Sequence, residues 1–79
     1  MDDASGKVIV LDVSNIEPPE PMVAILEKIR ELGPADILEV SHHREPIPLY
    51  PLLEEAGFTH EIEKLGENSY RLKIRRKNG

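Results

Sequence analysis

The stretch Lys7–Pro21, KVIVLDVSNIEPPEP, joins a β-rich apolar run to the first turn of a helix. Residues 7–13 are apolar at nearly every position, as expected of an interior strand that is covered on both faces or paired in parallel. Prolines at positions 18, 19 and 21 then fix backbone dihedrals and remove N–H donors. The stretch therefore predicts a strand, a rigid turn and a helix that begins near residue 20.

The spacing of the next apolar residues predicts the extent of that helix. From Met22 to Leu32 they recur at the interval of one helix face, so we expect a helix over roughly residues 20–32. Gly33 in the left-handed conformation, followed by Pro34, is expected to end it. Similar reasoning predicts a strand at 37–42, a helix from about 48 to Gly57, and strands at 58–65 and 69–76.

This order of elements, β-α-β-α-β-β, predicts an α/β fold. Parallel β-α-β crossovers are right-handed in nearly all proteins, which places both helices on one face of the sheet. The last two strands are joined by a short loop rich in turn-forming residues and are expected to form a hairpin. We therefore expect a two-layer α/β sandwich with a four-stranded mixed sheet, and we treat residues 1–79 as a single domain.

Composition narrows the class of protein. The chain has 79 residues and a net charge of −5. It contains no cysteine, and this excludes thiol nucleophiles, cysteine-based zinc sites and a disulfide scaffold. No apolar run approaches the length of a membrane span, and the acidic start is unlike a signal peptide. We expect a cytoplasmic protein that is stabilised by packing alone.

A basic face is expected on the last strand. Arg71, Lys73 and Arg75 alternate with apolar residues, so they point away from the core. Glu61 and Glu63 on the preceding strand project onto the same face, where they can form cross-strand ion pairs. A solvated strand face explains this pattern; an RNA or nucleotide surface is the alternative, but it lacks exposed aromatic residues for stacking.

The proline turn carries a family resemblance. Leu11-Asp12, followed by Ile16-Glu17-Pro18-Pro19-Glu20-Pro21 and an apolar helix, resembles the opening of the TusA/SirA-like sulfur carriers, whose motif reads LD, then GL, any residue, and CPxP. Pro18 stands where that family carries its persulfide-accepting cysteine, so sulfur-carrier activity is not implied. The segment from His42 to Phe58 is more similar to the uncharacterised, cysteine-lacking branch. Members of that branch occur alone or fused to hemerythrin-like di-iron domains, which implies a redox or metal-related setting and a hemerythrin-like or other redox protein as partner.

A candidate binding edge follows from the expected topology. The carboxyl ends of two parallel strands lie at the same edge of the sheet, where ligands of open α/β sheets usually bind. This edge brings together the proline turn and the end of the second strand, so its expected partner- or ligand-binding residues are Glu17, Pro18, Pro19, Glu20, Pro21, His42, His43, Arg44 and Glu45. The helix start and Arg44 favour an anion or a carboxylate there, whereas local capping and pairing of the acids is the plainer alternative.

The histidines admit both a structural and a metal-binding role. With Leu38 and Val40 pointing inward, His42 also points inward as a hydrogen-bonded core residue, and His43 points outward. An iron or zinc site formed by His42, His43 and Glu17 is chemically compatible with imidazole and carboxylate ligands, although no HxxxH-type spacing supports it. His60 lies in phase with Phe58, which indicates a structural role.

Catalysis is the least supported function class. Ser41 beside the two histidines is the one pairing that suggests acid–base chemistry, but adjacent strand residues diverge, and no glycine elbow or phosphate loop is present. We therefore expect a non-enzymatic binding module without a cofactor, with iron or zinc binding or delivery through His42 and His43 as the alternative.

Overall fold

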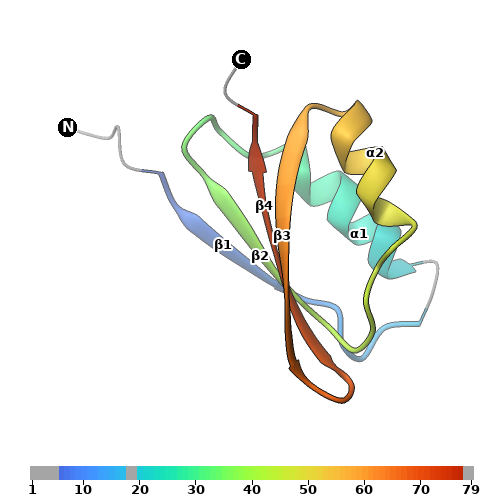
Figure 1. Ribbon diagram of the computed structural model, residues 1–79. Helices are drawn as coiled ribbons and strands as arrows, with labels where there is room; N and C mark the ends of the chain where they lie inside the picture. Colours follow the sequence, from blue (N-terminus) through green and yellow to red (C-terminus); the bar gives the residue numbers. More distant parts are fainter. Residues whose placement is uncertain (1–5, 18–19, 78–79) are drawn as a thin grey trace.

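The computed structural model describes residues 6–17 and 20–77. Its elements follow the predicted order β-α-β-α-β-β (Figure 1). Their bounds are β1 Val8–Asp12, α1 Glu20–Ile29, β2 Ile37–His42, α2 Leu49–Glu55, β3 Phe58–Gly66 and β4 Ser69–Arg76. None of the helices in this part of the chain is long and apolar enough to cross a membrane.

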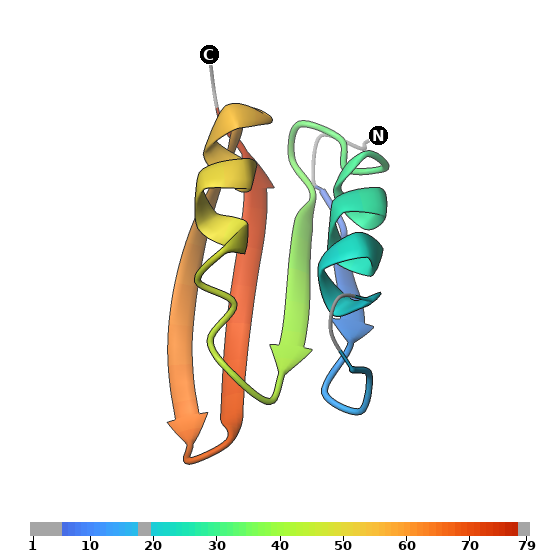
Figure 2. The same ribbon diagram turned by 90° about the vertical axis from the view of Figure 1, so that its right-hand side faces the viewer.

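The four strands form one mixed sheet in the order β1-β2-β4-β3. Strands β1 and β2 are parallel, with Val10 opposite Glu39, while β4 is antiparallel to both β2 and β3. Both helices lie on the same face of this sheet, α1 over β1 and β2 and α2 over β3 and β4 (Figure 2). The predicted two-layer α/β sandwich is therefore confirmed.

The core lies between the sheet and the two helices. Alternation predicted the inward residues correctly: Leu38, Val40 and His42 of β2 are buried, as are Leu72 and Ile74 of β4. The buried apolar cluster comprises Val13, Ile25, Ile29, Leu32, Leu38, Val40, Leu49, Leu53, Phe58, Leu72 and Ile74. The open face of β3 and β4 carries the expected charges, and Arg71 pairs there with Glu63 at 3.6 Å.

The first helix ends earlier than the sequence predicts. It stops at Ile29, and Leu32 then donates its N–H to the Ile29 carbonyl (3.1 Å) in a tighter turn. Gly33 does not adopt the predicted left-handed conformation, and its N–H donates to the Asp36 carboxylate (2.8 Å). The Leu32 carbonyl accepts a hydrogen bond from Arg76 Nε (2.8 Å), so two local hydrogen bonds and one long-range hydrogen bond lie where the glycine stop was expected.

The second helix ends as predicted. Gly57 follows it with a φ of 88°, a conformation that glycine adopts without the steric cost of a Cβ atom. This turn leads directly into β3.

The position of β1 in the sheet differs from the expectation of an interior strand. It lies at the edge, next to β2 only, and the side chains of Val8 and Val10 are 60% and 65% exposed. Its apolar composition reflects parallel pairing and burial of the Ile9 and Leu11 face against the core. A nearly continuous apolar run is compatible with either an interior or an edge strand that pairs in parallel.

Candidate functional site

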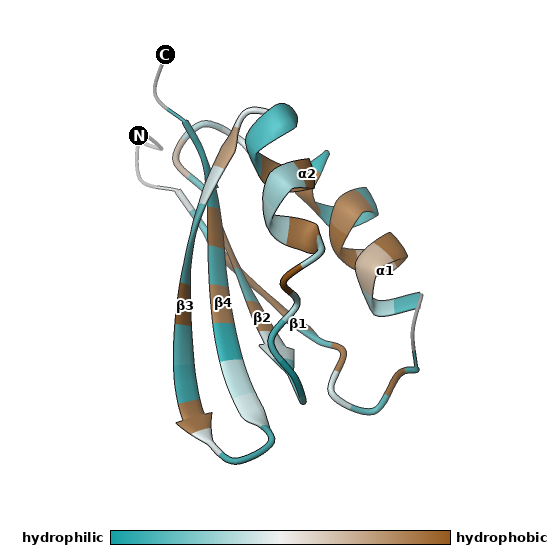
Figure 3. Ribbon diagram, turned by 45° about the vertical axis from the view of Figure 1, so that its right-hand side comes forward, coloured by the Kyte–Doolittle hydropathy of each residue, from teal (hydrophilic) through white to brown (hydrophobic). Residues whose placement is uncertain are grey.

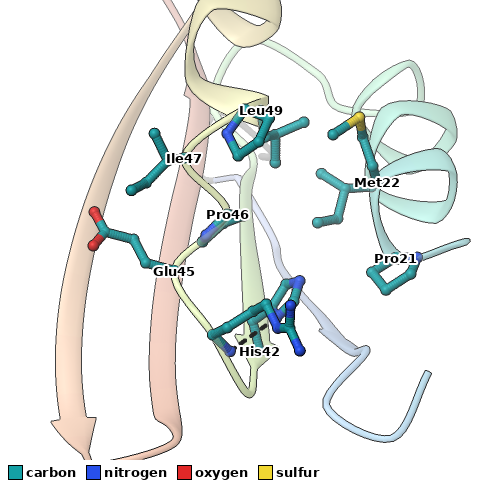
Figure 4. Close-up of a pocket in the computed structure, with 10 residues that line it drawn as sticks. Pro21, Met22, His42, Glu45, Pro46, Ile47 and Leu49 are labelled. Atoms are coloured by element: carbon teal, nitrogen blue, oxygen red, sulfur yellow. Dashed lines mark hydrogen bonds between the residues drawn. The ribbon is translucent and has the colours of Figure 1, made fainter. Parts of the chain in front are cut away.

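A pocket of about 430 Å³ lies at the edge where β1 and β2 end. One wall is the start of α1, and the other is the segment that leads from β2 into α2 (Figure 4). Hydrophobic residues dominate both walls, as Figure 3 shows for α1 and for the start of α2. The lining residues are Pro21, Met22, Ile25, His42, Arg44, Glu45, Pro46, Ile47, Pro48 and Leu49. Small-molecule pockets in proteins have volumes of about 300–1,000 Å³, so this one is large enough for a small ligand or for side chains of a partner.

The sequence places this pocket through its crossover and its prolines. The parallel pairing of β1 with β2 brings the segment after Asp12 and the segment after His42 to the same end of the sheet. Pro46 and Pro48 then restrict the backbone of the segment before α2 and delete N–H donors that an apolar wall would leave unsatisfied. The opposite wall begins at Pro21, which is buried in the first turn of α1.

The expected edge residues divide between the pocket and its surroundings. Pro21, His42, Arg44 and Glu45 line the pocket. The acids Glu17 and Glu20 are exposed and are not part of its lining, and His43 lies half-buried beside it. Pro18 and Pro19 lie outside the described residues.

Sequence reasoning missed the apolar lining. The helical spacing assigns Met22 to the apolar face of the first helix and Leu49 to the second helix, and it gives Ile47 no role, yet all three line the pocket. The one signal that could have found them is the density of prolines after His42, because a stiff segment without regular structure cannot collapse fully onto the core.

His42 forms the polar base of the pocket. Its side chain is only 6% exposed, and its Nδ1 accepts a hydrogen bond from the Arg44 backbone N–H (3.2 Å; Figure 4). A ring nitrogen that accepts a hydrogen bond carries no proton, so the neutral ring is protonated on Nε2. Burial, followed by the charges of His43 and Arg44, lowers the pKa of His42 below 6.5. The pocket therefore contains a neutral imidazole donor at pH 7.

The lowered pKa of His42 predicts a loss of stability in mild acid. Below pH 6.5 the unfolded chain binds a proton at His42 that the folded protein resists, so the free energy of unfolding falls as pH drops toward the folded-state pKa. We expect the urea midpoint to decrease between pH 7 and pH 5. His42→Gln keeps an acceptor for the Arg44 N–H but does not titrate, so its midpoint will decrease less; equal decreases in both proteins would contradict this assignment.

The two adjacent histidines do not diverge as strand neighbours do. Strand β2 ends at His42, and the rings of His42 and His43 stack with centroids 5.1 Å apart and planes 30° apart. The Nδ1 atom of His43 is buried and has no hydrogen-bond partner within the described residues. Residues 6–17 and 20–77 contain no group of three or more His, Cys, Asp or Glu placed to hold a metal ion, so Glu17 does not complete a site with this pair.

A second aromatic contact lies outside the pocket lining and reaches it through Glu45. The ring of Tyr50 in α2 stacks on His60 of β3, with centroids 4.2 Å apart, which agrees with a structural role for His60. The Tyr50 hydroxyl donates to the Glu45 carboxylate (3.1 Å). Burial, assisted by Glu45, raises the pKa of Tyr50 to about 12, so the hydroxyl keeps its proton and this bond persists at neutral pH. The bond directs the Glu45 carboxylate away from Pro21 and Met22 (Figure 4).

The fold and the site together define a small two-layer α/β domain with an apolar pocket at the carboxyl edge of its parallel strands. The chain belongs to a family described as an uncharacterized conserved protein, DUF2249, whose model matches residues 10–76. Comparison with curated proteins and with solved structures gave no match.

Proposed function

We propose that this protein is a non-catalytic binding module of the TusA/SirA-like type that docks a partner protein or small ligand at the pocket between α1 and the segment before α2. The observation that carries the proposal is the apolar pocket itself, which joins the two segments expected to form the binding edge. An apolar cavity with a few convergent polar groups is the usual form of a ligand site.

The polar groups of the pocket define the chemistry of the ligand. His42 Nε2 carries a proton that can be donated, and Arg44 supplies a positive charge, while the Glu45 carboxylate is engaged by Tyr50. These groups suit an oxygen acceptor, and the remaining walls suit a hydrocarbon group. The fitting ligand is thus an apolar group that bears a carboxylate or carbonyl, either as a small molecule or as a segment of a partner protein.

Replacing Arg44 with alanine is expected to weaken the binding of a simple carboxylate probe. A hydrogen bond to a charged group contributes about 1.5 kcal/mol, so the Kd of hexanoate rises roughly tenfold, while the Kd of hexanol is unchanged. Backbone amide shifts of labelled protein in a titration with each probe measure both constants. Arg30→Ala, an exposed arginine outside the pocket lining, is the matched control.

The same variants separate the two sources of ligand. One outcome is that the wild-type protein binds hexanoate, while wild type and Arg44→Ala capture the same proteins from the cell extract. In that case the ligand is a small molecule. A protein captured through Arg44 identifies a partner. Equal behaviour of Arg44→Ala and Arg30→Ala with both the probes and the extract would refute the proposed site.

The family resemblance supplies the proposed setting. The LD and PPEP segments are similar to the TusA/SirA-like motif with its cysteine replaced, and the order of helices and strands agrees with that resemblance. We therefore propose a redox or metal-related context, with a hemerythrin-like or other redox protein as partner, in the cytoplasm.

Metal binding or delivery through His42 and His43 is the alternative function. The proximity of the two rings, whose centroids are 5.1 Å apart, favours it, as does the Nδ1 atom of His43, which has no hydrogen-bond partner among the described residues. Against it, His42 Nδ1 is engaged by the Arg44 N–H, so a metal ion must bind at Nε2 and displace that proton. Addition of zinc or ferrous iron to the labelled protein tests the alternative: saturable shifts at one equivalent that disappear in His43→Ala support it, and unchanged histidine signals reject it.

A further inference from the structure

Tyr50 lies outside the pocket lining but forms a hydrogen bond with one member of it. Its hydroxyl donates to the carboxylate of Glu45 (3.1 Å), which is the one acid among the lining residues. Arg44 is the one residue of the lining with a fixed positive charge. The charge that a ligand meets in the pocket therefore depends on where the Glu45 carboxylate is held.

Local hydrogen bonds bring Tyr50 back toward Glu45, which lies five residues earlier in the chain. The Glu45 carbonyl accepts from the Ile47 N–H (2.9 Å), which closes a three-residue turn around Pro46. Proline fixes φ close to the value that the central residue of such a turn requires. The Tyr50 N–H then donates to the Ile47 carbonyl (3.1 Å) as α2 begins. This restricted path sets the Tyr50 hydroxyl within reach of the Glu45 carboxylate.

The Tyr50 ring is held between two elements of the fold. It belongs to α2 and stacks on His60 of β3, with ring centroids 4.2 Å apart and planes 12° apart. Burial, followed by the contact with Glu45, raises the pKa of Tyr50 to about 12, so the hydroxyl keeps its proton at neutral pH. A ring that is already fixed loses little rotamer freedom when its hydroxyl binds a carboxylate. Tyr50 is therefore a persistent donor to Glu45.

This hydrogen bond determines the direction of the Glu45 side chain. The carboxylate points toward β3 and away from Met22 on the α1 wall (Figure 4). Glu45 is exposed, so without the bond its side chain can rotate toward the cavity that it lines. A carboxylate in that position repels an anion and attracts a cation.

We propose that Tyr50 is a specificity-determining residue of this pocket: by holding the Glu45 carboxylate toward β3, it makes the pocket prefer an anionic ligand to a cationic one. The inference rests on the proposed function, because it concerns the charge of the ligand that the same pocket binds. Tyr50 is a positioning residue, since it acts through Glu45 and does not line the cavity.

Three six-carbon probes with different head groups test this selectivity: hexanoate, hexylammonium and uncharged hexanol. Backbone amide shifts at neutral pH give each Kd for wild type and for Tyr50→Phe, and the Kd of hexanol in the same protein corrects for changes in the apolar walls. In Tyr50→Phe we expect the Kd ratio of hexanoate to hexanol to rise about threefold or more, and the ratio of hexylammonium to hexanol to fall by a similar factor. Opposite shifts for the two charged probes are the signature of a moved charge.

Removal of the Glu45 charge tests whether Tyr50 acts through it. In the double variant Tyr50→Phe/Glu45→Gln no carboxylate remains to turn toward the ligand, so the rise in the hexanoate ratio should disappear. Phenylalanine keeps the ring that stacks on His60, so Tyr50→Phe removes the hydroxyl alone. Tyr70→Phe is the matched control, because it removes the hydroxyl of a half-buried tyrosine outside the lining and should keep both wild-type ratios. Unchanged ratios in Tyr50→Phe, or a hexanoate ratio that stays raised in the double variant, would overturn the proposal.

The same titrations distinguish failure of this inference from failure of the proposed function. If wild-type protein binds hexanoate through Arg44 while Tyr50→Phe keeps both ratios, the pocket binds its ligand as proposed and the role of Tyr50 alone is wrong. If wild-type protein binds neither hexanoate nor hexanol, the proposed function is wrong, and the role of Tyr50 is rejected with it.

Discussion

Replacing Leu72 with alanine is expected to lower the free energy of unfolding by about 2–5 kcal/mol. Leu72 is fully buried in β4, an interior strand, where it lies opposite Val40 of β2 and Ile62 of β3. Truncation removes apolar burial and leaves a cavity that neighbouring strands cannot close without losing their own pairing. A domain of this size is stabilised by roughly 5–10 kcal/mol, so the variant retains only a fraction of that margin.

Urea unfolding followed by circular dichroism measures this loss, and Ile62→Ala is its matched control. Ile62 pairs with Leu72 across the hairpin, but 36% of its side chain is exposed. The control therefore removes similar hydrocarbon with little cavity, and we expect it to cost about 1 kcal/mol or less. Equal destabilisation by the two substitutions would mean that the core does not centre on β4.

The fold could be predicted from the sequence because its local patterns are strong. Strict alternation gave the bounds of β2 and β4 and the inward positions of Leu38, Val40 and Leu72. Helical spacing gave α1 and α2, and the right-handed crossover placed both on one face. Each of these inferences concerns neighbours in the chain or a general rule of handedness, which sequence periodicity reports directly.

Features that depend on distant partners could not be predicted. The edge position of β1 depends on β4 inserting next to β2, and a nearly continuous apolar run is compatible with either position. The Leu32 carbonyl, three residues beyond the end of α1, accepts a hydrogen bond from Arg76, which lies 44 residues further along the chain. These arrangements are set by tertiary contacts, and no local propensity encodes them.

The candidate site was likewise predicted only in part from the sequence. Topology alone brought Pro21, His42 and Arg44 to one edge, and the structure places all of them in the lining of one pocket. The apolar character of that pocket arises from the conformation of residues 45–48, which have no periodic pattern. Sequence reasoning therefore anticipated a polar edge and missed the cavity that gives the edge its chemistry.

Replacing Met22 with tryptophan is expected to abolish binding of an apolar carboxylate at this pocket. Met22 is half-buried at the start of α1 and faces the segment before α2 across the cavity (Figure 4). An indole at this position occupies the space of the ligand's hydrocarbon chain. Burial contributes about 0.8 kcal/mol per methylene, so exclusion of the chain of hexanoate removes about 4 kcal/mol, roughly a thousandfold in Kd.

The neighbouring residue provides a control for the added tryptophan. Val23 is 50% exposed on the same turn of α1 and does not line the pocket, so Val23→Trp introduces the same side chain outside the site. Titration with hexanoate and urea unfolding of both variants separate loss of binding from loss of stability. Met22→Trp should remain folded and lose the probe, whereas Val23→Trp should bind it like wild type. If the folded Met22→Trp protein still binds hexanoate with wild-type affinity, the hydrocarbon chain does not enter this pocket, and the ligand chemistry inferred from its walls is wrong.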